Sequence, residues 1–277
     1  MKDGNHNSRR CRERIGLIPA GGEATRIAPL PCSKELYPVG WHEDNQKLTM
    51  RPKVVSHYLL ERMRAADVHK AYIVLRKGKW DIPRYFGDGK FVDLHLAYLT
   101  VDLHFGVPYT IDQAFPFIEH ATVLFGFPDV IFQPDNAFVN LLERQTDTNA
   151  DVVLGLFAAH RPQNTEMVAV DGDGAVLAVE IKPRRTALHH NWIIAVWNPS
   201  FTWHLHDFIE QDLRRKGQHG SGLDRQEEVH CGNVIQAAIE KGLKINSVFF
   251  SQGSYLDIGT PEDLAKTFRP LNLSVVR

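Results

Sequence analysis

Residues 15–39, IGLIPAGGEATRIAPLPCSKELYPV, constrain the fold of this chain more than any other stretch. They begin with a short apolar run that is bounded by a proline, which predicts a buried parallel strand. Gly21 and Gly22 follow, and consecutive glycines let backbone N–H groups approach an anion closely because no Cβ intervenes. Arg26 and Lys34 add positive charge where phosphate oxygens would lie. The stretch therefore predicts a strand and an anion-binding loop, with a plain turn and two surface cations as the simpler alternative.

Alternating strand and helix patterns follow this loop. Residues 54–66 place apolar side chains at helical spacing between charged ones, and residues 71–75 form another short apolar run. A strand, a helix and a second strand at this spacing predict a parallel sheet with a right-handed crossover. Such sheets bind ligands beyond the carboxyl ends of their strands, which is where the glycine loop lies. We therefore expect an α/β protein with its site at that edge.

Two later stretches carry carboxylates close to predicted strand ends. Residues 121–132, ATVLFGFPDVIF, predict an apolar strand that ends in a turn, with Asp129 beside the turn. In residues 255–264, YLDIGTPEDL, Thr260 is placed to cap a helix that begins at the following proline. This cap gives no reason for Asp257, which lies just outside the helix. A solvated turn residue would explain Asp129 if it were considered alone, whereas Asp257 has no such local explanation.

A hairpin pattern lies between these two stretches. Residues 167–170 and 175–181 flank an Asp-Gly-Asp-Gly turn, which predicts two antiparallel strands. The second strand ends in EIKP, which contains Glu180 and Lys182. A surface acid and base on an edge strand would explain this tetrapeptide if it were considered alone.

Composition excludes several classes of protein. The net charge is −1 over 277 residues, which gives no support for broad electrostatic binding to nucleic acid. No apolar run approaches the ~20 residues that a membrane-spanning helix needs. The three cysteines show no metal-ligand spacing, so we expect reduced thiols in a cytoplasmic protein.

The chain is expected to form one folded unit after a short lead-in. Residues 1–13 are polar, end in basic residues and lack the apolar core of a signal peptide, so we expect them to be disordered. Residues 14–277 are expected to form a single domain. Within that domain, residues 213–228 are polar and rich in glycine, which predicts a mobile loop.

The motifs together resemble the signature of the sugar nucleotidyltransferases, most closely its glucose-1-phosphate thymidylyltransferase branch. Residues 15–39 are similar to the family pattern L-x-A-G-G-x-G-T-R-L-x-P-x-[ST]-x-x-x-K-x-x-x-P-V. Residues 180–183 resemble E-x-K-P, residues 255–264 resemble [WY]-x-D-x-G-T-x-x-x-L, and Asp129 resembles the aspartate of G-D-x-x-[FY] after a local insertion. Ala24 replaces the second loop glycine of the pattern, and a positive φ there would cost an alanine energy that glycine avoids.

The resemblance implies a Rossmann-like three-layer α/β/α nucleotidyltransferase fold with a mostly parallel central sheet. It also implies a set of site residues. These would be Ala20, Gly21, Gly22, Thr25, Arg26 and Lys34 for the nucleotide, Glu166, Glu180 and Lys182 for the acceptor, and Asp129 and Asp257 for a catalytic Mg²⁺. Arg26, Lys34 and Lys182 would act on the phosphates during catalysis.

The implied reaction moves a nucleoside monophosphate from a nucleoside triphosphate, dTTP or UTP, to a sugar 1-phosphate such as glucose 1-phosphate. The products would be a nucleotide sugar and pyrophosphate. Because an acceptor phosphate is already anionic near neutral pH, positioning and charge stabilisation would provide the catalysis without a general base. Members of the family are often oligomeric, which implies a homo-oligomer.

Two alternatives to this reaction stay open. Glu166 stands where the family has a sugar-contacting glycine, and Ala195 stands where it has the glycine of a T-G pair. A pocket changed in this way would suit a cytidylyltransferase that acts on a phosphonate or another phosphorylated small molecule. The second alternative is a non-catalytic module that senses nucleotides or nucleotide sugars, and nucleotide binding without turnover would distinguish it.

Overall fold

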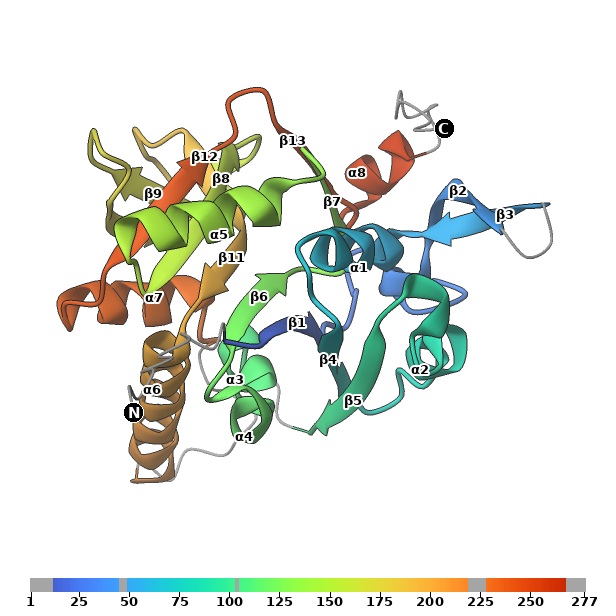
Figure 1. The fold of residues 1–277 in the computed structure, drawn as a ribbon, viewed down its shortest axis with the longest axis horizontal. Helices are drawn as coiled ribbons and strands as arrows, with labels where there is room; N and C mark the ends of the chain where they lie inside the picture. The colour runs from blue at the N-terminus through green and yellow to red at the C-terminus, as the bar shows by residue number, and fades with distance from the viewer. Residues whose placement is uncertain (1–11, 45–48, 103–104, 219–227, 268–277) are drawn as a thin grey trace, which may run out of the picture.

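The computed structural model describes residues 12–44, 49–102, 105–218 and 228–267. Its central sheet has nine strands, which are β1 (Arg14–Ala20), β4 (Lys70–Arg76), β5 (His95–Val101), β6 (Thr122–Gly126), β8 (Val152–Ala158), β9 (Glu166–Val170), β10 (Val176–Ile181), β11 (His190–Trp197) and β12 (Ile245–Phe249). The strand order is β10-β9-β11-β6-β1-β4-β5, and β8 pairs with both β11 and β12 (Figure 1). The predicted disorder of residues 1–13 falls almost wholly outside the described residues.

The middle of this sheet is parallel. β1 pairs in parallel with β4 and β6, and β4 pairs in parallel with β5. β11 runs antiparallel to β6 and β8, so the sheet is mixed beyond β6. The predicted α/β fold with a mostly parallel central sheet is confirmed, and α1 (Val55–Ala65) is the helix that was predicted between the first two parallel strands.

Helices cover both faces of the central sheet (Figure 1). Besides α1 they are α2 (Asp81–Phe86), α3 (Val107–Asp112), α4 (Phe115–Ile118), α5 (Ala137–Thr148), α6 (Pro199–Gln218) and α7 (Cys231–Glu240), whereas α8 (Pro261–Lys266) lies away from the central sheet. In β1, Ile15 and Leu17 belong to the apolar cluster that holds side chains of α3, α6 and α7. Ile18 and Ala20 belong to the cluster that holds side chains of α1 and α5. Alternate residues of one buried strand thus serve two cores, as a three-layer fold requires.

Two short antiparallel sheets lie outside the central sheet. β7 (Val130–Gln133) pairs with β13 (Ser254–Asp257), and β2 (Pro38–Asp44) pairs with β3 (Thr49–Val54). The β2–β3 hairpin projects from the body of the molecule (Figure 1). The sequence did not predict it, because the side chains of β3 are mostly exposed and lack the alternation of apolar and polar residues that marks a strand.

The helix α6 corrects one prediction. A loop was expected over residues 213–228, but α6 continues to Gln218. Leu213 packs against the core, and Nζ of Lys216 lies 2.8 Å from Oδ2 of Asp212 one turn earlier, so the polar segment gains support as a helix. Residues 219–227 of the expected loop lie outside the described residues. Among the helices that the structure describes, none combines the length and apolarity needed to cross a membrane.

Candidate active site

A cleft of about 520 Å³ opens at the carboxyl ends of β1 and β6. Segments distant in sequence line it: the loop after β1, the turn after β6, the β9–β10 hairpin, the start of β11 and the end of β13. Its place agrees with the rule that parallel sheets bind ligands beyond the carboxyl ends of their strands. The predicted residues that line it are Gly21, Gly22, Arg26, Lys34, Asp129, Glu166, Lys182 and Asp257.

The other three predicted residues lie outside this lining. Ala20 is buried at the end of β1, with its side chain in the core, and Thr25 is exposed in the following turn. Glu180 is exposed on β10, the edge strand of the sheet. Residues two apart in a strand normally share a face, but Lys182 lies just past the end of β10 with a φ of 44°. This left-handed turn separates Lys182, which lines the cleft, from Glu180, which does not.

The glycine loop brings the backbone close to two side chains of the cleft. A Cβ on Gly22 would lie 3.6 Å from Nζ of Lys34, and a Cβ on Gly21 would lie 3.3 Å from Oγ1 of Thr110. The φ of Ala24 is 55°, so an alanine occupies the left-handed conformation that favours glycine. The loop therefore keeps the shape expected of its sequence pattern at the expense of local strain.

The small β7–β13 sheet brings Asp129 and Asp257 together. Asp257 faces Val130 in the register of the pair, and the N–H of Ile258 donates to the carbonyl oxygen of Asp129 at 3.1 Å. The Asp257 carboxylate also accepts from the N–H of Gly259 at 2.7 Å. Burial, and then the neighbouring charge of Asp129, raise the pKa of Asp257 to about 6. The two carboxylates thus repel each other in a low-dielectric setting that favours a bound cation.

Lys34 and Arg26 supply positive charge beside these carboxylates. Nζ of Lys34 lies 2.5 Å from Oδ2 of Asp129. Burial disfavours the charge of Asp129, but the Lys34 ammonium outweighs burial and lowers the pKa of Asp129. A Cβ added to Gly259 would lie 2.9 Å from Oδ1 of Asp257 and 3.1 Å from Nη2 of Arg26. The missing side chain of Gly259 therefore leaves the space in which these two charged groups approach each other.

A second ion pair lies next to Lys34. Glu35, in the short 3-10 helix η1 (Lys34–Leu36), is 1% exposed and accepts a hydrogen bond from Nζ of Lys79 at 2.6 Å. Burial of Lys34 would lower its pKa, but the charges of Asp129 and Glu35 outweigh this effect and raise it. Lys34 is therefore held fully protonated between two acids.

Another part of the cleft is formed by the β9–β10 hairpin and by β11. Lys182 enters it in its left-handed conformation, which is strained for a residue other than glycine and is typical of functional positions. Glu166, at the start of β9, accepts a hydrogen bond from Nε1 of Trp192 at 2.8 Å. Asn191 donates to the hydroxyl of Tyr255 at 3.1 Å. Carboxylate, amide and phenol groups therefore surround a lysine in this part of the cleft.

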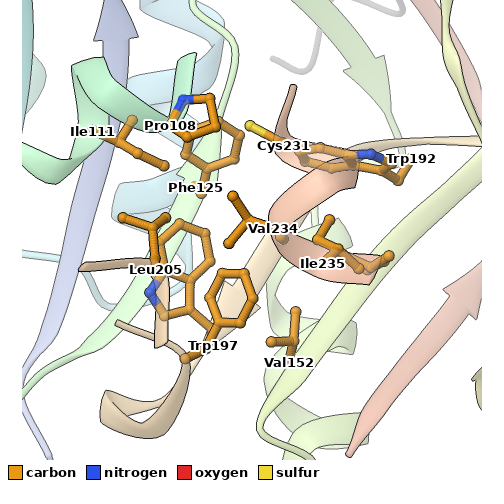
Figure 2. Close-up of a pocket in the computed structure, with 13 residues that line it drawn as sticks. Pro108, Ile111, Phe125, Val152, Trp192, Trp197, Leu205, Cys231, Val234 and Ile235 are labelled. Atoms are coloured by element: carbon orange, nitrogen blue, oxygen red, sulfur yellow. The ribbon is translucent and has the colours of Figure 1, made fainter. Parts of the chain in front are cut away.

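The sequence motifs did not single out Asn191 and Trp192, although both line the cleft. Asn191 is 1% exposed within an otherwise apolar strand, and a buried amide in such a strand is the signal that could have identified it. Trp192 also borders a small apolar cavity of about 20 Å³, and Cys231 of α7 is another of its lining residues (Figure 2). This cavity is too small for a nucleotide or a sugar and belongs to the core that supports the cleft.

Comparison with known proteins places this arrangement in a family. A family model described as "Nucleotidyl transferase" matches residues 15–272. The chain belongs to the nucleotidyl transferase family. The match includes the glycine loop, both aspartates of the cleft and the β9–β10 hairpin.

Two proteins similar to this nucleotidyl transferase carry more specific names. The glucose-1-phosphate thymidylyltransferase of Streptomyces antibioticus is 23% identical over 259 residues, which cover 91% of this chain and 65% of the relative's length. A crystal structure of a Bacillus anthracis protein assigned as a glucose-1-phosphate thymidylyltransferase, in complex with a sucrose, has a TM-score of 0.73 and 17% identity. That alignment covers 92% of this chain and 93% of the other. At this identity, the structural likeness shows a shared fold.

Proposed function

We propose that this nucleotidyl transferase moves a nucleoside monophosphate from a nucleoside triphosphate to the phosphate of a small acceptor and releases pyrophosphate. The observation that carries the proposal is the gathering of Arg26, Lys34 and Lys182 in one cleft with Asp129 and Asp257. Surface turns with scattered charges would not bring these five residues together from separate segments. The basic side chains suit the phosphates of the substrates, and the two carboxylates suit the metal ion that accompanies those phosphates.

The acceptor phosphate is the nucleophile in this reaction. One of its oxygens forms a bond to the α-phosphorus while the bond from that phosphorus to the pyrophosphate oxygen breaks. Lys182 would hold the acceptor phosphate, Lys34 would steady the triphosphate, and Arg26 would stabilise the charge that develops on pyrophosphate. Gly21 and Gly22 would offer backbone N–H groups to the nucleotide. Lys34 would exchange part of its contact with Asp129 for phosphate oxygens when the triphosphate enters.

Asp129 and Asp257 would hold Mg²⁺. Their closeness, expressed in the raised pKa of Asp257, makes a divalent cation a suitable partner for the pair. In the described part of the chain, no group of three or more acidic, histidine or cysteine side chains is placed to hold a metal. Magnesium fits a site with two protein carboxylates, because it commonly binds one or two carboxylates together with substrate phosphates and water. The ion would neutralise phosphate charge in the transition state.

The preferred substrates within this proposal are dTTP or UTP with a sugar 1-phosphate such as glucose 1-phosphate. The names of the two similar proteins, which both specify glucose-1-phosphate thymidylyl transfer, support this choice. The chain spans about 65% of the length of the Streptomyces relative. We further propose a cytoplasmic protein that acts as a homo-oligomer.

Pyrophosphate release tests the proposed function. The protein would be mixed with Mg²⁺, with each of dTTP, UTP, CTP, GTP and ATP, and with glucose 1-phosphate or other phosphorylated acceptors. The proposal predicts pyrophosphate release that requires both a triphosphate and an acceptor. Binding of nucleotides without pyrophosphate release from any pair would contradict it and favour a sensing module.

A further inference from the structure

Glu166 lines the cleft as an expected acceptor residue, but the proposed reaction gives its carboxyl group no defined role. A neutral sugar hydroxyl can be bound by amide, hydroxyl or backbone groups, and a carboxylate inside a cleft costs free energy when it has no cationic partner. Glu166 nevertheless lines the cleft that would bind the acceptor. Among the described residues, no basic side chain lies within 4.0 Å of its carboxylate. The Glu166 carboxyl group therefore has no direct ion pair among these residues, and the charge of Lys182 acts on it only from beyond this distance.

The Glu166 carboxylate is held in a fixed position. Nε1 of Trp192 donates to its Oε2 at 2.8 Å, and the backbone N–H of Gly232 also donates to this carboxyl group. Gly232 belongs to the first turn of α7, and a Cβ there would lie 3.1 Å from Oε2 of Glu166, so glycine permits this close approach. Burial raises the pKa of Glu166 despite these hydrogen bonds. The donors orient the carboxylate without supplying a full opposite charge.

The hairpin register places this carboxylate beside the predicted phosphate-binding lysine. Glu166 pairs with Ile181 across β9 and β10, and Lys182 is the next residue, whose N–H donates to the carbonyl oxygen of Thr165 at 3.0 Å. Both side chains line the cleft, and the charge of Lys182 opposes the rise in the pKa of Glu166 that burial causes, so the two groups are near each other. If the phosphate of a ligand binds to Lys182, the ligand atoms next to that phosphate would therefore lie close to Glu166.

The charges around Lys182 also favour a ligand that carries a positive group. Among the described residues, Lys182 and His230 are the basic residues in this part of the cleft lining, and Glu166 and Glu228 contribute carboxylates. Oε2 of Glu228 lies 3.9 Å from Nζ of Lys182, which is too long for a hydrogen bond, so the ammonium keeps its donors for a phosphate. Phe127 and Trp192, whose ring centroids are 5.7 Å apart, add aromatic faces to the lining, and such faces attract cations.

We infer that the acceptor carries a protonated amine close to its phosphate, and that Glu166 is the residue that selects it. This inference rests on the proposed nucleotidyl transfer and names the class of acceptor. The phosphate would lie on Lys182 and the ammonium on the Glu166 carboxylate, with Trp192 beside it. An amino sugar 1-phosphate and an open-chain amino alcohol phosphate share this chemistry.

Matched pairs of acceptors test the inference. Glucosamine 1-phosphate would be compared with glucose 1-phosphate, and phosphoethanolamine with 2-hydroxyethyl phosphate, so that each pair differs in an amine and a hydroxyl. The readout is kcat/KM for pyrophosphate release at pH 7 with the preferred triphosphate. We expect kcat/KM to be about 10- to 100-fold higher for the amine than for the hydroxyl compound in at least one pair, since hydrogen bonds to charged groups contribute a free energy of that size. The pair that responds distinguishes a sugar from an open-chain acceptor.

Glu166→Gln separates selection by charge from a structural role of the side chain. The glutamine keeps one amide oxygen that can still accept from Trp192 but loses the charge, so the amine preference should fall to about parity while nucleotide-induced thermal stabilisation is kept. Glu143→Gln, an exposed site on α5, is the matched control and should keep the wild-type preference.

Three outcomes would overturn these statements in different ways. Equal use of amine and hydroxyl acceptors by the wild type, or an amine preference that survives in Glu166→Gln, would refute the inference and leave nucleotidyl transfer intact. Absence of pyrophosphate release with every acceptor and triphosphate would refute the proposed function itself.

Discussion

The two aspartates of the cleft differ in what surrounds them. Asp129 is neutralised by Lys34 at 2.5 Å, whereas Asp257 accepts from the N–H of Gly259 and is repelled by Asp129. Asp257 was recognisable in the sequence because the helix cap that follows it gave it no structural task. Its partner Asp129 is 128 positions away, so their contact depends on strand pairing that a single sequence does not reveal.

Asp257→Asn should remove catalysis while preserving the local fold. The amide oxygen can still accept from Gly259, but the pair loses the charge that would hold Mg²⁺. We expect kcat to fall by about 10²- to 10³-fold, as for other groups that stabilise transition-state charge. Pyrophosphate release measures the loss, and Asp147→Asn on the exposed face of α5 is the control. Full Mg²⁺-dependent turnover by Asp257→Asn would refute the metal assignment.

Ala24→Gly should stabilise the protein. The φ of Ala24 is 55°, and a left-handed residue with a Cβ is strained by about 1–2 kcal/mol. Glycine removes that strain but loses more entropy on folding, so the free energy of unfolding should rise by up to about 1 kcal/mol. Urea unfolding gives the value. Ala187→Gly changes an exposed alanine without a positive φ, so this control should instead lower the free energy of unfolding. Equal destabilisation by Ala24→Gly and Ala187→Gly would contradict the account.

At the scale of elements, local patterns were predictive and distant pairings were not. The hairpin of β9 and β10 was predicted because both strands and their Asp-Gly turn are contiguous. The side-chain cap of α8 was predicted from Thr260 and Pro261 and is confirmed, since Oγ1 of Thr260 accepts from the N–H of Asp263 at 3.2 Å. The β7–β13 pairing was not predicted, because its strands lie more than a hundred residues apart. Neither was the turn at Lys182, whose φ of 44° separates it from Glu180.

Thr260→Val should loosen α8 and the segment that precedes it. Valine keeps the shape but cannot accept from Asp263, and the loss of such a cap costs about 1 kcal/mol of helix stability. Amide hydrogen exchange at Leu264, whose N–H donates to the carbonyl oxygen of Thr260, should quicken about fivefold. Thr146→Val within α5 is a matched control. Unchanged exchange at Leu264 would show that the cap does not hold the helix.

At the scale of the whole molecule, stability depends on groups that are buried away from the cleft. His57 of α1 is 4% exposed, and its ring lies among His42, Phe86 and Phe91. Burial, reinforced by the charge of Lys53, lowers the pKa of His57 to about 3. Below its ordinary pKa of 6.5, the unfolded chain therefore binds a proton that the folded protein does not.

Acid should destabilise the protein partly through His57. As pH falls from 6.5 towards 3, the free energy of unfolding should decrease, by about 2 kcal/mol at pH 5 from this residue alone. His57→Phe removes the titrating group, so its stability should fall less than that of the wild type between pH 7 and pH 5. Urea unfolding at both pH values measures the difference, with the exposed His120→Phe as the control. Parallel losses in wild type and His57→Phe would contradict the prediction.

The fate of labelled phosphate tests nucleotidyl transfer most directly. Triphosphate labelled with ³²P at the α-position, or separately at the γ-position, would be incubated with Mg²⁺, acceptor and protein, and the products would be separated. We predict that the α-label appears in a nucleotide-linked acceptor and the γ-label in pyrophosphate, with both signals lost in Asp257→Asn. Transfer of the γ-label to the acceptor, or release of the α-label only as free nucleoside monophosphate, would show phosphoryl transfer or hydrolysis and contradict the account.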